Sequence, residues 1–226
     1  MRRFTLLGVA VLSVLALASI AASAAFALPT LNPATAVTFT GTGGLGKLEV
    51  LNSSLKVECK KNKNEGNFAA NTVLGPFHIT FEECSAKLGE VSLGTCTGLG
   101  DTAKPGTILS LGEDHIVYDT LVTLGAALLF LLEPVHFECK SITTVLFVVT
   151  GSEICLISPI NTATTSIKVN CNAAEKGDAL ETRYWNDAGE EKKSELLVSE
   201  NEKAAVDGSE SAEAVLTPSH AVEVVA

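Results

Sequence analysis

Two short segments of the chain carry a histidine and a glutamate with the spacing of one strand face. Pro76–Glu82 contains His78 and Glu82, and Pro134–Glu138 contains His136 and Glu138. Phenylalanines alternate with these residues, so the polar side chains of each segment share the outward face. If the two strands are neighbours, the four side chains form a metal site or an acid–base cluster. The alternative is an ordinary solvated sheet face.

A second acid–histidine group consists of Asp114, His115 and Asp119. Ser110 or Ser152 would be the nucleophile of a hydrolase built on this group. No G-x-S-x-G motif accompanies the serines, and the spacing does not constrain their geometry. The sequence therefore favours a group without catalytic function.

Two binding functions are suggested by residues in turns and near the C-terminal part. Loop carboxylates at Glu113–Asp114, or at Asn186–Asp187 with Glu190–Glu191, are candidate calcium ligands, although they lack EF-hand spacing. The adjacent aromatic residues Tyr184 and Trp185 are a candidate platform for stacking on a glycan. Packing at the edge of the core is the favoured interpretation of this pair.

The glycine-rich segment Gly41–Gly46 matches G-x-G-x-x-G literally. A dinucleotide site requires that motif between a strand and a helix. Here Lys47–Val50 continues as a strand, so the sequence predicts a hairpin turn and no cofactor.

The cysteines are even in number, which predicts disulfides in an exported protein. A structural metal cluster is disfavoured because no C-x-x-C pair is present. Strand phase places several of the sulfurs in a core, and Cys84 falls out of phase, which predicts a bulge near Glu82–Glu83. The expected pairs are Cys84–Cys96, Cys155–Cys171 and Cys59–Cys139.

Alternation with a period of two from Ala36 onward predicts a chain of strands separated by short turns. Leu121–Leu132 and Ile142–Val149 are apolar on both faces and predict buried strands, with a buried helix as the alternative for the first. Glu190–Glu213 is compatible with a helix, a loose segment or a charged edge strand. The expected fold is all-β, a disulfide-linked antiparallel sandwich of two sheets with Greek-key-like connections, and a barrel is the alternative.

The first residues have the pattern of a secretory signal peptide. Arg2 and Arg3 precede the apolar run Phe4–Ile20, and small residues follow. Cleavage is expected after Ala27 or, alternatively, after Ala24, and an uncleaved anchor is the rival interpretation. Residues 28–226 then form a single β domain whose part from about 186 to 226 is acidic, with no membrane span after cleavage.

The composition excludes two classes of protein. The 226 residues are 46% hydrophobic and 19% charged, which is too apolar for an acidic disordered chain. The formal net charge of −10 argues against nucleic acid as a partner, because such binders need a basic face.

Several segments resemble a group of uncharacterised secreted β-rich proteins from high-GC Gram-positive, actinobacterial bacteria. The resemblance is carried by Phe81–Cys84, Cys96–Gly98 and Val149–Asn161. Three residues, Glu153, Cys155 and Cys171, depart from the pattern of that group. The resemblance implies a secreted β fold and no particular activity.

Together these features predict a secreted, extracytoplasmic protein with a non-enzymatic binding or structural role at or outside the cell surface. A cell-surface or extracellular polymer is the expected kind of partner. One alternative is a carrier of small ligands whose apolar cavity is lined by Leu121–Leu132. The other is a secreted hydrolase, for which the sequence shows no catalytic constellation.

Overall fold

The computed structural model describes residues 29–51, 53–68, 75–100, 104–119, 125–171, 183–186 and 190–226. These residues form strands and turns, and among them no helix has the length and apolar character needed to cross a membrane. The strands are β1 (Thr30–Asn32), β2 (Val37–Val50), β3 (Leu55–Phe68), β4 (Gly75–Leu88), β5 (Val91–Gly98), β6 (Thr107–Asp119), β7 (Ala126–Lys140), β8 (Thr144–Ser158), β9 (Ile167–Cys171), β10 (Arg183–Trp185), β11 (Glu191–Lys193), β12 (Leu196–Glu200), β13 (Val206–Pro218) and β14 (Glu223–Val225).

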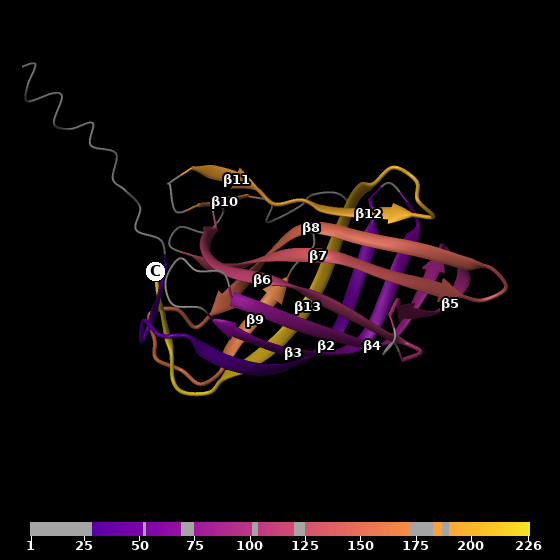
Figure 1. The fold of residues 1–226 in the computed structure, drawn as a ribbon. Helices are drawn as coiled ribbons and strands as arrows, with labels where there is room; N and C mark the ends of the chain where they lie inside the picture. Colours follow the sequence, from indigo (N-terminus) through magenta and orange to yellow (C-terminus); the bar gives the residue numbers. More distant parts are fainter. Residues whose placement is uncertain are drawn as a thin grey trace, which may run out of the picture.

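Twelve of the strands form one antiparallel sheet, and β1 and β14 form a separate two-stranded sheet. In the large sheet the pairings run from β2 through β3, β4, β6, β7 and β8 to β9 and β12, both of which pair with β13. Because β13 also pairs with β2, the pairings form a closed ring. Strands β6, β7 and β8 pass across β2, β3, β4 and β13 (Figure 1). The predicted all-β, antiparallel and disulfide-linked fold is confirmed.

Two clusters of buried apolar side chains fill most of the ring. The terminal cluster contains Leu31 and Val224 of the small sheet, together with residues such as Phe77 of the large sheet. The distal cluster contains Leu55, Phe137 and two disulfides. The rings that contact one another within these clusters are Phe39 with Phe68, Phe77 with Phe130, and Phe137 with Phe147.

Alternation along the strands places these core residues as predicted. In β3, Leu55, Val57 and Cys59 are buried while Lys56 is exposed. The irregularity expected near Glu82–Glu83 is also present, since Glu83 has a left-handed φ of 57°. There β4 changes its neighbour from β6 to β5, and the inward phase changes with it.

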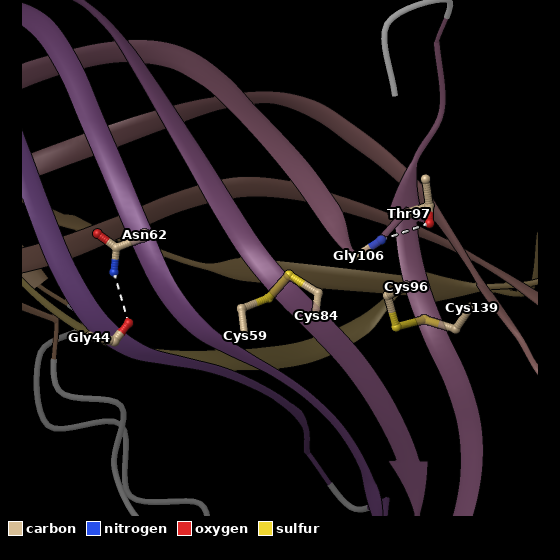
Figure 2. Close-up of a disulfide and its surroundings, with 8 residues drawn as sticks. All are labelled: Gly44, Cys59, Asn62, Cys84, Cys96, Thr97, Gly106 and Cys139. Carbon is tan, nitrogen blue, oxygen red and sulfur yellow. Dashed lines mark hydrogen bonds between the residues drawn. A yellow bond between two sulfur atoms is a disulfide. The ribbon is translucent and has the colours of Figure 1, made fainter. Parts of the chain in front are cut away.

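Two of the three predicted disulfide pairings are wrong. Cys59 is bonded to Cys84 instead of Cys139, and Cys96 is bonded to Cys139 instead of Cys84 (Figure 2). The predicted Cys84–Cys96 and Cys59–Cys139 pairs fail because of strand register. Cys59 lies directly opposite Cys84 in the β3–β4 ladder, and Cys96 lies opposite Cys139 in the β5–β7 ladder. Each bridge therefore joins residues of paired strands.

The third predicted pair, Cys155–Cys171, is confirmed and joins β8 to β9. All six cysteines are thus oxidised, and none is free. Three disulfides are consistent with an extracytoplasmic protein, because disulfides persist in oxidising compartments.

The segments whose structure the sequence left open are strands. Residues 126–132 of the first apolar run belong to β7 and not to a helix, while residues 121–124 lie outside the described residues. Ile142 lies in the exposed turn before β8, so the second run becomes a strand only at Thr144. Glu190–Glu213 contributes to β11, β12 and β13.

Candidate functional site

A surface groove of about 500 Å³ lies where β4, β5, β6 and β7 meet. It forms because β7 changes its neighbour along its length. Residues 126–132 of β7 pair with β6, whereas residues 137–140 pair with β5. At the change, the Leu99 N–H donates a hydrogen bond of 2.9 Å to the His136 carbonyl oxygen, which fixes the end of β5 beside β7.

The lining of this groove combines exposed leucines with polar and charged side chains. Leu99 is 51% exposed and Leu109 is 46% exposed. Leu111 is half-buried and Val135 is buried, so the apolar lining continues from the surface into the protein. The charged and titratable residues that also line the groove are Glu82, Lys104, Glu133 and His136.

The four residues of the predicted histidine–glutamate cluster do not come together as a metal site. Glu82 and His136 line the groove, but His78 is exposed elsewhere on β4 and Glu138 forms an ion pair with Lys140. The reason is that β5 or β6 always separates β4 from β7. Neighbouring strands lie about 4.8 Å apart, so side chains on β4 and β7 are separated by two such spacings.

Tyr184 packs against the outer face of the ring, where Val117, Leu129 and Ile154 form a third apolar cluster. Trp185 is half-buried and lies opposite Tyr118 in the β10–β6 ladder. The packing of Tyr184 favours an edge-packing role, and the stacking of a glycan on this pair stays a prediction.

The two described side chains of the acid–histidine group on β6, those of Asp114 and His115, lie on opposite faces of the strand. Asp114 is buried and the adjacent His115 is half-buried, because neighbouring strand residues point to opposite faces. Burial raises the pKa of Asp114 to about 8, and its Oδ2 has no hydrogen-bond partner in the described part of the chain. Glu113 is exposed, and the side chain of Asp119 lies outside the described residues.

The predicted calcium ligands near the β10–β11 turn are engaged with cationic side chains. Glu190 forms an ion pair with Lys192 at 2.7 Å, and Glu191 forms one with Arg183 at 3.0 Å. These contacts hold the two short strands together, and Asp187 lies outside the described residues.

A layer of polar side chains crosses the interior of the ring between the terminal and distal clusters. We call it the polar layer, and it consists of Asn62, Asn64, Ser110, Glu153 and Glu210. Asn64 donates a hydrogen bond of 2.7 Å to the Asn62 side-chain oxygen, and Glu210 is hydrogen-bonded to Glu153. Two cavities of about 40 and 50 Å³ adjoin the layer, and Ser110 and Glu210 line both of them.

The acidic pair of the polar layer has an unusual environment. Burial raises the pKa of Glu210 to about 7, although the hydrogen bond from Glu153 acts in the opposite direction. Glu210 keeps some accessible surface because it borders the cavities, yet protein atoms surround its carboxyl group. The other titratable residues along the cavities are Lys47, Glu65, His78 and Glu213.

The glycine-rich segment supports this layer and is not the predicted hairpin turn. Gly41–Gly46 lies inside β2, where the Asn62 side-chain amide donates a hydrogen bond of 3.3 Å to the Gly44 carbonyl oxygen (Figure 2). A Cβ at Gly43 would lie 2.0 Å from the Glu213 carbonyl oxygen and 2.5 Å from the Asn62 amide. The glycines therefore permit a close approach between strands, which is a common use of glycine within a strand.

The sequence did not identify the polar layer as a site. Asn62 and Asn64 are buried because the inward positions of β3 change from odd to even numbers after Cys59, and the local sequence pattern does not show that change. Glu153 is the one acid within β8, and such an isolated carboxylate in an apolar strand is the signal that could have identified it.

One group of three possible metal ligands is present in the described ranges, and it includes Glu153. Its carboxylate lies within 4.8 Å of the sulfurs of Cys155 and Cys171. Those sulfurs are bonded to one another, so the group is a carboxyl beside a disulfide and not a thiolate metal site.

Comparisons of the chain with protein families, with curated proteins and with solved structures find no match. The geometry of the groove and of the polar layer is therefore the basis for inferring function.

Proposed function

We propose that this protein is an exported, non-enzymatic binding module that holds an apolar segment of a partner protein in the groove between β4 and β7. The observation that carries the proposal is the position of Leu99 and Leu109, two exposed leucines that line one hollow of about 500 Å³. Single exposed leucines need no explanation, but a hollow in which leucine, valine and proline side chains lie beside polar ones has the composition of a binding site.

The chemistry of the lining favours a peptide over a glycan. The described residues that line the groove include leucine, valine and proline side chains and no phenylalanine, tyrosine or tryptophan ring on which a sugar would stack. The interior cavities of about 40 and 50 Å³ adjoin buried carboxyl groups, so they support the alternative of an apolar-ligand carrier less well. The three disulfides support the proposed export.

Peptides selected from a random twelve-residue display library provide the test. Fluorescence polarisation should show that selected peptides bind the wild type and lose at least tenfold in affinity for Leu109→Ser. Leu88→Ser is the matched control, because Leu88 is also 46% exposed but does not line the groove. Equal binding to Leu109→Ser and the wild type, or an equal loss in both variants, would contradict the proposal.

A further inference from the structure

Four turns of the ring lie together at one end of the molecule, which we call the distal end. It consists of the β2–β3, β4–β5, β7–β8 and β12–β13 turns with the strand ends beside them, residues 50–55, 87–93, 140–146 and 199–207, of which all but residue 52 are described. Lys140 pairs with Thr95, so the β7–β8 turn lies beside β5. Three backbone hydrogen bonds of 2.9 Å connect the other turns and strand ends: Gly89 N–H to the Ser54 carbonyl, Leu51 N–H to the Asp207 carbonyl, and Asn201 N–H to the Leu146 carbonyl.

Apolar side chains are exposed mainly at the distal end. Five of the ten large hydrophobic side chains that are exposed in the described part of the chain lie there, namely Leu88, Val91, Ile142, Leu146 and Val206. Ile142 is 101% exposed at the tip of the β7–β8 hairpin, which reaches beyond the other strands of this end (Figure 1). Turns usually carry glycine, asparagine, aspartate or serine at such a position. Exposed apolar residues that gather in one region indicate an interaction site, whereas scattered ones do not.

A hollow of about 490 Å³ lies at the same end, between the β2–β3 and β12–β13 turns. Leu55 and Val198, which are buried in the distal cluster, line it together with Val206, which is 46% exposed. The apolar lining therefore extends from the core to the surface. The polar lining residues are Ser53, Glu200, Lys203 and Asp207. A volume within the range of ligand sites, about 300–1,000 Å³, has room for one aliphatic side chain and the turn that carries it.

The charge of the distal end favours a second copy of the chain over a membrane. Its segments contain three lysines and four acidic residues, whereas the whole chain has 16 basic and 26 acidic residues. Attraction to anionic lipids needs a basic excess, and proteins that insert at the membrane interface use tryptophan and tyrosine, which these segments lack. Copies of an acidic chain repel one another, so they meet at the lowest cost where their charges nearly cancel.

We propose that two copies of the chain associate through their distal ends, with Ile142 of each copy seated in the hollow of the other. The projecting side chain and the hollow lie at the same end, so one two-fold axis brings both pairs together, as an isologous interface requires. The four turns offer about as many residues as one side of a standard interface, roughly 20–30. Hydrogen bonds already order these turns in the single chain, which lowers the entropic cost of association. The peptide groove shares no lining residue with the distal end, so the dimer is independent of the proposed peptide binding.

Sedimentation equilibrium of the full folded protein tests the dimer. The wild type should reach twice the mass of one chain, with a dissociation constant on the order of 10⁻⁶ M, the weak end of the range for interfaces of standard size. Ile142→Ser should weaken association at least tenfold, and Val206→Glu, which places a charge in the hollow, should do the same. Leu45→Ser is the control and should associate like the wild type, because Leu45 is 58% exposed on β2 but lies outside the distal end.

A mixture of the two weakened variants distinguishes this contact from a general loss of folding. In the mixed dimer, Ile142 of the Val206→Glu chain enters the intact hollow of the Ile142→Ser chain. The mixture, with one variant carrying a fluorescent label, should therefore associate at least threefold more tightly than either variant alone.

A wild type that stays monomeric would overturn the proposal. A mixture that associates no better than its components would also overturn it, as would an equal loss in Leu45→Ser and Ile142→Ser. Flotation of a monomeric wild type with phosphatidylglycerol vesicles, lost in Ile142→Ser, would assign the distal end to a lipid surface instead.

Discussion

At the scale of single residues, neighbouring glycines in β2 have different roles although the sequence shows them as one run. Gly43 faces the Glu213 carbonyl oxygen and the Asn62 amide at distances that exclude a Cβ. Gly44 has nothing within 4 Å of the position of a Cβ. The close approach at Gly43 lets the Asn62 side-chain amide donate a hydrogen bond to the Gly44 carbonyl oxygen. This hydrogen bond connects the polar layer to the backbone of β2.

This difference predicts opposite results for two conservative substitutions. Gly43→Ala should lower the free energy of unfolding by about 1–3 kcal/mol, because the added methyl group forces β13 or Asn62 to move. Gly44→Ala should change it by less than about 0.5 kcal/mol, as is usual for an open surface position. Urea unfolding followed by Trp185 fluorescence measures both. A Gly43→Ala protein as stable as the wild type would mean that the strands are farther apart than described.

At the scale of the elements, one disulfide strengthens the hydrogen-bonded pairings that position β5. Strand β5 pairs with β4 at one end and with β7 at the other, and Cys96–Cys139 joins it to β7 beside the groove. Because Leu99 follows directly after β5, the disulfide also fixes one wall of the groove.

Removal of this disulfide should therefore affect both stability and the groove. The bridge spans 43 residues, so loop-closure entropy predicts that Cys96→Ala/Cys139→Ala costs about 4 kcal/mol. The pair Cys155→Ala/Cys171→Ala spans 16 residues and should cost about 3 kcal/mol, without change to the groove. Hydrogen exchange should be faster in β5 for the first variant only. Faster exchange in β5 of both variants would show that the ring opens as a unit.

The elements also show how far the sequence could predict this molecule. Alternation over Leu55–Cys59 is a local signal, so it was sufficient to predict a strand with an inward cysteine. The partner of Cys59 depends on which strand lies next to β3, and contacts between distant segments decide that order. Asn62 and Asn64 were missed for a related reason. The β2–β3 ladder is interrupted between the Gly46–Cys59 and Gly43–Asn62 pairs, and the inward phase changes there.

At the scale of the whole molecule, two groups of carboxylates respond to pH in opposite directions. Glutamates of β2 and β4 are paired with lysines, and of these Glu49 and Glu82 are half-buried and Glu83 is exposed. The hydrogen bonds from Lys47, Lys63 and Lys60 lower the pKa of Glu49, Glu82 and Glu83, respectively. Such groups stabilise the folded state above their unfolded pKa of about 4.5, and this contribution is lost as the pH falls through the folded value.

Asp114 and Glu210 act in the opposite sense, because burial raises the pKa of Asp114 to about 8 and that of Glu210 to about 7. The folded state binds their protons more tightly than the unfolded chain does. Their contribution to stability is therefore complete below about pH 4 and is lost as the pH rises to about 8. For Asp114 the loss is at most about 6 kcal/mol, since each pKa unit corresponds to about 1.4 kcal/mol.

We therefore expect stability to be highest near pH 4–5 and to decline toward pH 8, which thermal unfolding between pH 3 and pH 9 measures. Asp114→Asn keeps the shape of the side chain but removes the titration, so the decline above pH 5 should become shallower and the unfolding temperature at pH 8 should rise. The exposed neighbour supplies the control, and Glu113→Gln should leave the profile unchanged. A maximum near neutral pH in the wild type, or parallel profiles for the wild type and Asp114→Asn, would show that the Asp114 carboxyl is solvated and that the ring is open at β6.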